Sequence, residues 1–177
     1  MARVLATVPG TNDLDRVWGL RPDFYQEFMK DHSRAIARVD PVILELCRLR
    51  LAQLFECRFS QALRYKRATE AGLTEKKIAE IPRHYASQLF TAQERCCIEF
   101  AEMFALGASN IADADVKKLE DAIGAEAMIY FLKALNVMDQ LQRSMSAFRF
   151  EPPAEPPASM PEFILTEGAG RYRADRC

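Results

Sequence analysis

The sequence has no long apolar run and no excess of charge. No stretch of about 18 apolar residues occurs in the chain, so it predicts no membrane-spanning helix. The 24 basic and 25 acidic residues give a formal net charge of -1, which leaves no overall field to hold nucleic acid or an anionic membrane. Pro9 and Gly10 follow too early for a signal-peptide core to form before them. We therefore expect a cytoplasmic protein that binds small molecules or other proteins.

Histidine is scarce, and the cysteines show no metal-binding pattern. His32 and His84 are the only histidines and lie far apart in the sequence. No pair among the five cysteines has zinc-finger spacing, so we expect neither a metal site nor a cofactor. The odd number of cysteines, all but Cys177 in helix-like segments, favours free thiols in a reducing compartment over structural disulfides.

Strand patterns are nearly absent, whereas helix boundaries recur along the chain. Pro22 and Pro41 suit first helical positions, and Thr91 with Glu94 forms a capping box. Gly72 suits the left-handed position that follows a helix. The fold class is therefore all-α. We expect helices at about residues 22–37, 41–55, 58–71, 74–82, 91–107, 113–124 and 125–147.

The composition changes after residue 150. Residues 1–150 are predicted to form a single helical domain, because a chain of this length builds one substantial core. Residues 151–177 contain five prolines that oppose a helix and favour an extended polyproline arm. Phe163, Ile164 and Leu165 follow the prolines. This apolar tip either docks on a neighbouring subunit or belongs to a loosely held tail.

One acidic residue lies on an apolar face of the predicted helix at residues 41–55. This helix is apolar on nearly all sides, which is typical of a buried element. Glu45 shares a stripe with Val42 and Leu49, so its carboxylate points inward and requires a partner. Arg48 is one of two further charged residues on the same helix.

Four segments together resemble a known family. They are Glu45–Ala52, Cys57, Ala71–Thr74 and Phe90–Arg95. Their order and spacing resemble the carboxymuconolactone decarboxylase and alkylhydroperoxidase D-like family, over about residues 22–148. The resemblance implies a single helical domain of the alkylhydroperoxidase D-like type. It also implies a homo-oligomer, either a trimer or a hexamer.

In the peroxidase branch, the resemblance implies a glutamate, a Cys-x-x-Cys pair and a histidine four residues after the second cysteine. Glu45 and Cys57 match this pattern, but Ser60 stands at the second cysteine and Arg64 at the histidine. Ser60 cannot form a disulfide. Arg64 cannot shuttle protons, because a guanidinium stays charged at ordinary pH. The catalytic candidates are therefore Glu45, Cys57, Ser60 and Arg64, with the redox pair broken.

Three interpretations of function stay open. In the first, a decarboxylase-like enzyme acts by acid–base chemistry on a small organic acid or lactone, without a cofactor. Glu45 then carries the proton, Arg64 anchors a carboxylate, and the other two candidates shape the pocket. In the second, a peroxiredoxin-like antioxidant enzyme uses the Cys57 thiol. In the third, a non-catalytic helical oligomer keeps Glu45 and Arg64 only as a mutual buried ion pair.

Overall fold

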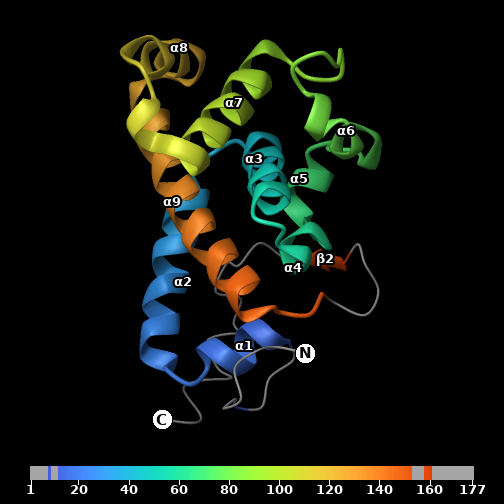
Figure 1. Ribbon diagram of the computed structural model, residues 1–177, viewed down its shortest axis with the longest axis vertical. Helices are drawn as coiled ribbons and strands as arrows, with labels where there is room; N and C mark the ends of the chain where they lie inside the picture. Colours follow the sequence, from blue (N-terminus) through green and yellow to red (C-terminus); the bar gives the residue numbers. More distant parts are fainter. Residues whose placement is uncertain (1–7, 9–11, 153–157, 161–177) are drawn as a thin grey trace.

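The computed structural model describes residues 8, 12–152 and 158–160. This described part is almost entirely helical, so the all-α prediction is confirmed (Figure 1). Its short strands are β1 (Leu63–Tyr65) and β2 (Ala158–Met160), and two 3₁₀ turns cover Ile81–Arg83 and Ala108–Asn110. Its helices are α1 (Asp13–Trp18), α2 (Pro22–Ile36), α3 (Pro41–Leu54), α4 (Arg58–Gln61), α5 (Lys66–Glu70), α6 (Glu75–Ala79), α7 (Ala92–Gly107), α8 (Asp113–Ile123) and α9 (Ala125–Phe148).

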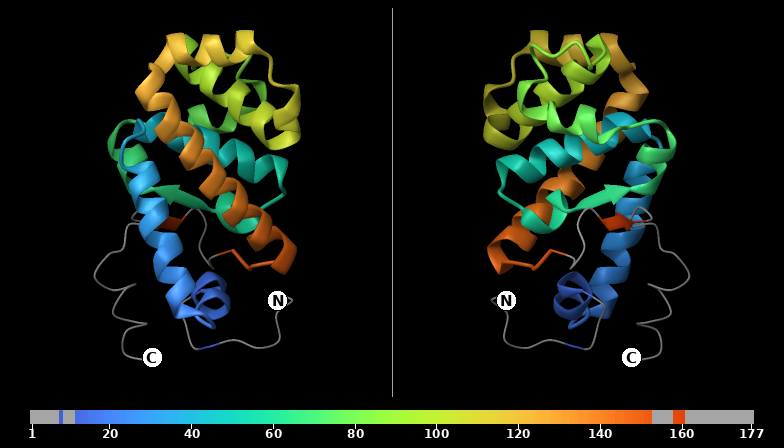
Figure 2. Two further views of the ribbon diagram at one scale, coloured as in Figure 1. Left: turned by 90° about the vertical axis from the view of Figure 1, so that its left-hand side faces the viewer. Right: turned by 90° about the vertical axis from the view of Figure 1, so that its right-hand side faces the viewer.

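Helix α3 lies at the centre of the bundle, and α7 and α9 pack against it (Figures 1 and 2). Pro41 starts α3, and the Asp40 carboxylate accepts hydrogen bonds from the backbone N–H groups of Val42 and Ile43. These bonds satisfy donors that have no partner within the helix. Nine of the 14 residues of α3 are buried, which confirms the buried position predicted for this helix.

Two long helices form one side of the bundle. Helix α2 packs against α9 (Figure 2), and Phe131, Leu135 and Met138 of α9 face the core. Gly124 joins α8 to α9 with a φ of 84°, a conformation that glycine adopts without the penalty other residues meet. Thr91 and Glu94 form the predicted capping box at the start of α7.

The helix predicted at residues 58–71 is wrong as a continuous element. The chain forms α4, then the strand β1, then α5 over this stretch. Strand β1 pairs in parallel with β2, and Leu63, Arg64 and Tyr65 align with residues 158, 159 and 160 (Figure 1). Three residues of the Pro-rich arm therefore lie against this chain's own domain. The tip at residues 163–165 and Cys177 lie outside the described residues.

Two negative findings hold for the described residues. None of the helices that the structure describes is long and apolar enough to span a bilayer. Within the same residues, no group of three or more histidine, cysteine, aspartate or glutamate side chains is arranged to hold a metal ion.

The end of α9 provides a test of backbone strain. Arg149 has a left-handed backbone, with φ 54° and ψ 54°, which costs a residue with a side chain more than it costs glycine. We expect Arg149→Gly to raise the free energy of unfolding by roughly 0.5–1 kcal/mol. Ala147→Gly, in the last helical turn, should lower it by up to about 1 kcal/mol. Urea denaturation measures both, and equal losses would contradict this account.

Candidate functional site

A buried ion pair occupies the middle of α3. Arg48 donates from Nε to Glu45 Oε2 at 2.6 Å and from its terminal nitrogen Nη2 to Glu45 Oε1 at 2.7 Å. The Glu45 side chain is 0% exposed and the Arg48 side chain 3%. This geometry is bidentate, the form in which arginine and carboxylate interact most strongly. Burial alone would lower the pKa of Arg48, but the neighbouring Glu45 carboxylate raises it, so the guanidinium stays charged.

The same pair holds the segment that follows Cys57. Arg48 donates to the backbone carbonyls of Ser60 at 2.8 Å and Leu63 at 2.9 Å, and Glu45 accepts the Tyr65 N–H at 3.0 Å. A continuous helix would use these three backbone groups for its own hydrogen bonds. Their capture by α3 side chains explains why the predicted helix breaks at β1. The Arg48 guanidinium also lies 4.6 Å from the centre of the Tyr65 ring.

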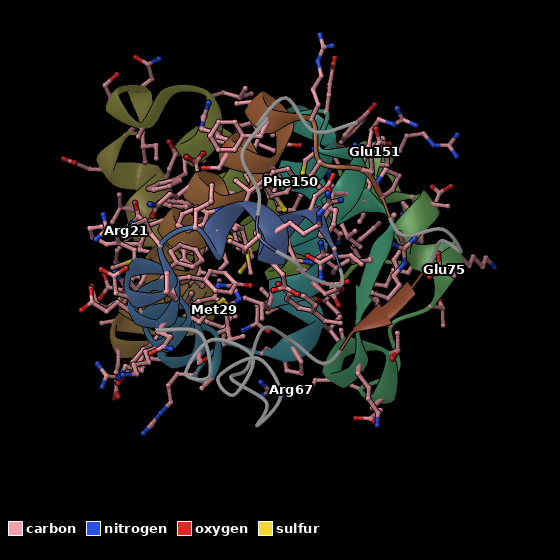
Figure 3. All side chains as sticks on the ribbon, turned by 90° about the horizontal axis from the view of Figure 1, so that it is seen from below. Arg21, Met29, Arg67, Glu75, Phe150 and Glu151 are labelled. Carbon is pink, nitrogen blue, oxygen red and sulfur yellow. The ribbon has the colours of Figure 1, made fainter. Side chains whose placement is uncertain are left out.

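Arg64 does not pair with Glu45, although its guanidinium donates to the Leu63 carbonyl that Arg48 also binds. Its guanidinium forms a bidentate pair with Glu75, at 2.7 and 2.9 Å, and Glu75 lies at the outer edge of the molecule in Figure 3. The hypothesis of a buried Glu45–Arg64 pair is therefore wrong. The guanidinium beside Glu45 belongs to Arg48, three residues further along the same helix, and this i,i+3 spacing was the sequence signal for it.

Cys57 lies within electrostatic range of the buried pair. It follows α3 directly, its backbone N–H donates to the Ala52 carbonyl at 2.8 Å, and it is 1% exposed. The pKa of Arg48, lowered by burial and raised chiefly by Glu45, is also raised by Tyr65 and Cys57. Three candidates thus come together around one guanidinium: Glu45, Cys57 and, through its backbone carbonyl, Ser60.

The other described cysteines have environments that suppress thiol reactivity. Burial raises the pKa of Cys47 well above its ordinary value, raises that of Cys96, and raises that of Cys97 to about 12. A thiol with a raised pKa forms little of the reactive thiolate at neutral pH. All four described cysteines are free and buried. Cys57 is the one that lies beside a buried guanidinium.

His32 lies near the site and was not identified from the sequence. It is fully buried on α2 and stacks on Phe28, with 6.1 Å between the ring centres. Burial, together with the positive charge of Arg48, lowers its pKa from 6.5 to about 4, although Asp31 opposes the shift. The imidazole is therefore neutral at pH 7.

Two pockets of contrasting chemistry lie near the C-terminal end of α9. An apolar pocket of about 720 Å³ is bounded by α1, α2 and α9, with Trp18, Phe24 and Phe28 in its lining. It includes none of the four catalytic candidates. A smaller, mostly polar pocket of about 500 Å³ is lined by residues on both sides of Cys57. The four candidates are absent from the lining of this pocket too, but its wall residues stand directly before and after Cys57 in the sequence, which makes it the pocket nearer to the thiol along the chain.

The described residues form an all-α fold around a buried ion pair. Residues 22–103 match the model of the carboxymuconolactone decarboxylase family, which supports the resemblance drawn from the sequence. No curated protein matches the chain.

A solved structure supports the fold assignment. It is that of a protein of unknown function from Agrobacterium tumefaciens, described as a candidate antioxidant defence protein AhpD. The two chains are 17% identical, with a TM-score of 0.69 over 88% of this chain and 100% of the other. At this level of identity the likeness shows a shared fold.

The buried pair predicts an unequal response to two carboxylate substitutions. Glu45→Gln leaves the buried Arg48 charge without its counter-ion, so we expect a loss of roughly 3–5 kcal/mol in the free energy of unfolding. Glu75→Ala breaks the more exposed pair with Arg64 and should cost less than about 1 kcal/mol. Chemical denaturation of both variants measures the difference. Similar losses in the two variants would show that the buried pair does not hold the fold.

His32 predicts a loss of stability in mild acid. Its pKa is about 4 in the folded protein against 6.5 normally, so the unfolded chain binds the proton first. The free energy of unfolding therefore has its full value, as far as His32 is concerned, above pH 6.5. It falls by about 3 kcal/mol as the pH drops towards 4. The free energy of unfolding, measured by chemical denaturation at several pH values in this range, should change less with pH in His32→Phe than in the wild type. An unchanged pH dependence in that variant would contradict the assignment.

Proposed function

We propose that this protein is a thiol-dependent enzyme of its family that reduces a small organic hydroperoxide at Cys57. The observation that carries the proposal is the position of Cys57, which directly follows α3 and begins the segment that the Arg48 guanidinium holds through the Ser60 and Leu63 carbonyls. Reaction with a hydroperoxide requires the thiolate, the nucleophilic form of a thiol.

The chemistry requires one sulfur and a reductant from outside the chain. The Cys57 thiolate attacks the outer oxygen of the hydroperoxide, the O–O bond breaks, and the product alkoxide takes the proton that the thiol lost. Sulfur is oxidised by two electrons to sulfenic acid, and the peroxide is reduced to an alcohol. A low-molecular-weight thiol then condenses with the sulfenic acid and releases water. A second such thiol reduces the mixed disulfide and restores Cys57.

Ser60 fits this single-thiol cycle, because a hydroxyl cannot act as the resolving thiol. Its described role is to offer its backbone carbonyl to Arg48 at 2.8 Å. Glu45 has a positioning role, since it fixes the guanidinium that acts on the sulfur. Arg64 has no part in this cycle, because Glu75 already binds it.

Acid–base turnover of a small organic acid or lactone is the second candidate, and the description of the matched family favours it. Glu45 would have to carry the proton. Its carboxylate oxygens already accept three hydrogen bonds, from Arg48 and the Tyr65 N–H. Such an enzyme would have to open the buried pair during turnover, whereas the thiol mechanism uses the pair as it stands.

Site-specific oxidation tests the thiol proposal. Treatment with a small excess of cumene hydroperoxide should form sulfenic acid at Cys57, detected by a dimedone probe and peptide mass spectrometry. Cys57→Ser should abolish peroxide consumption, whereas Cys97→Ser should leave it unchanged, because the pKa of Cys97 is raised to about 12 by burial.

Two outcomes would overturn this function. One is a folded protein whose Cys57 stays reduced under these conditions. The other is decarboxylation or hydrolysis of an organic acid or lactone that persists in Cys57→Ser, which would favour the acid–base candidate.

A further inference from the structure

The polar pocket beside Cys57 is built from two parts of the chain. One wall is the stretch around Cys57, with Phe55, Glu56, Arg58 and Phe59, and the other is the stretch that follows α9. Ser146 at the end of α9 donates its hydroxyl to the Phe55 carbonyl at 2.9 Å. This bond ties the walls together, so the pocket of about 500 Å³ is part of the folded domain.

The buried side of this pocket is apolar and includes the neighbours of Cys57. The rings of Phe59 and Phe150 meet edge to face, with 6.2 Å between their centres. Both rings belong to the same buried cluster as Cys57 and Met145. Figure 3 shows Phe150 near the middle of the molecule, with Glu151 further towards its edge. A ligand in this pocket would therefore lie against the aromatic rings of the cluster that also contains Cys57.

The rim of this pocket carries two arginines and two glutamates. Arg58 and Arg149 line it and are exposed, and across the described residues neither guanidinium has an ion-pair partner. Glu56 also lines the pocket without an ion-pair partner in the described part of the chain, whereas Glu151 is engaged with another group. The formal charges of the lining balance, so the two guanidinium groups without an ion-pair partner, and not a net charge, are what suits a carboxylate here.

Backbone strain is concentrated at the same place. Glu56 has a φ of 51° and Arg149 a φ of 54°, and within the described residues these are the non-glycine positions with positive φ. Each conformation costs roughly 1–2 kcal/mol more than it would for glycine. Strained residues persist where the surrounding structure enforces them, and they are common at ligand sites. Both of these residues line the pocket beside Cys57.

We propose that this pocket binds a small organic monoanion. The carboxylate of the ligand pairs with Arg58 and Arg149, and the apolar body of the ligand lies on Phe59 and Phe150. This inference deepens the proposed function and, for the reaction itself, rests on it. The substrate class at Cys57 is then a hydroperoxide that carries a carboxylate on an apolar body. Guanidinium groups suit this role because they bind carboxylates through paired N–H donors.

Calorimetric titration of the full chain with benzoate tests the binding site directly. Benzoate should bind at least about tenfold more tightly than neutral benzamide, and Arg58→Gln should weaken it about tenfold. Glu56→Gln should tighten it severalfold, because it removes the opposing charge. Arg34→Gln, at an exposed arginine outside the pocket, should leave binding unchanged. Arg149→Gly should weaken binding even though it relieves strain and stabilises the fold, so that unfolding cannot account for the loss.

A second measurement links the pocket to the reaction. Cys57 should be oxidised several times faster by the para-carboxylate of cumene hydroperoxide than by cumene hydroperoxide itself, and Arg58→Gln should remove the difference. One outcome is that Cys57→Ser binds benzoate as the wild type does, while neither peroxide oxidises Cys57 in the wild type. This outcome would support the site and overturn the proposed function. Equal binding of benzoate and benzamide, or no effect of Arg58→Gln on benzoate binding, would overturn the site whatever the reactivity of Cys57.

Discussion

The buried ion pair between Glu45 and Arg48, which are three residues apart on α3, organises the centre of this protein. Removing two charges from water costs several kcal/mol per ion, and only good geometry with further hydrogen bonds offsets that cost. Here Glu45 accepts three hydrogen bonds, and Arg48 also donates to two backbone carbonyls. The pair thereby fixes the segment of residues 57–65 against α3 and sets a positive charge near the Cys57 sulfur.

Much of the architecture follows from local pattern. The proline at the start of α3, the capping box of α7 and the apolar surface of α3 predicted these helices and the buried position of α3, and an inward-pointing Glu45 followed from its helical stripe. The break at β1 did not follow, because residues 58–71 have an acceptable helical pattern. What interrupts them is the capture of their backbone groups by side chains from another helix, and such a tertiary effect overrides local propensity.

The candidate site was predictable in part for the same reason. The family pattern pointed to one cluster of Glu45 and Cys57, and Glu45 binds the Arg48 guanidinium, with Cys57 within its electrostatic range. The partner of Glu45 was misassigned to Arg64, since a family pattern puts that position near the thiol. Arg64 instead pairs with the exposed carboxylate of Glu75, and Arg48 fills the buried position from within α3. The pocket around residues 55–59 and 146–151 depends on the path of the chain after α9, and no local sequence pattern predicts that path.

The central claim is that the buried pair makes Cys57 the reactive thiol. The most direct test is the rate of sulfenic acid formation at Cys57 in the double variant Glu45→Met/Arg48→Met, which removes both charges and leaves no unpaired ion. With the helical fold verified by circular dichroism, the account predicts that peroxide oxidation of Cys57 slows at least about tenfold, the effect of losing one charged contact. Oxidation at the wild-type rate in this folded variant would contradict it.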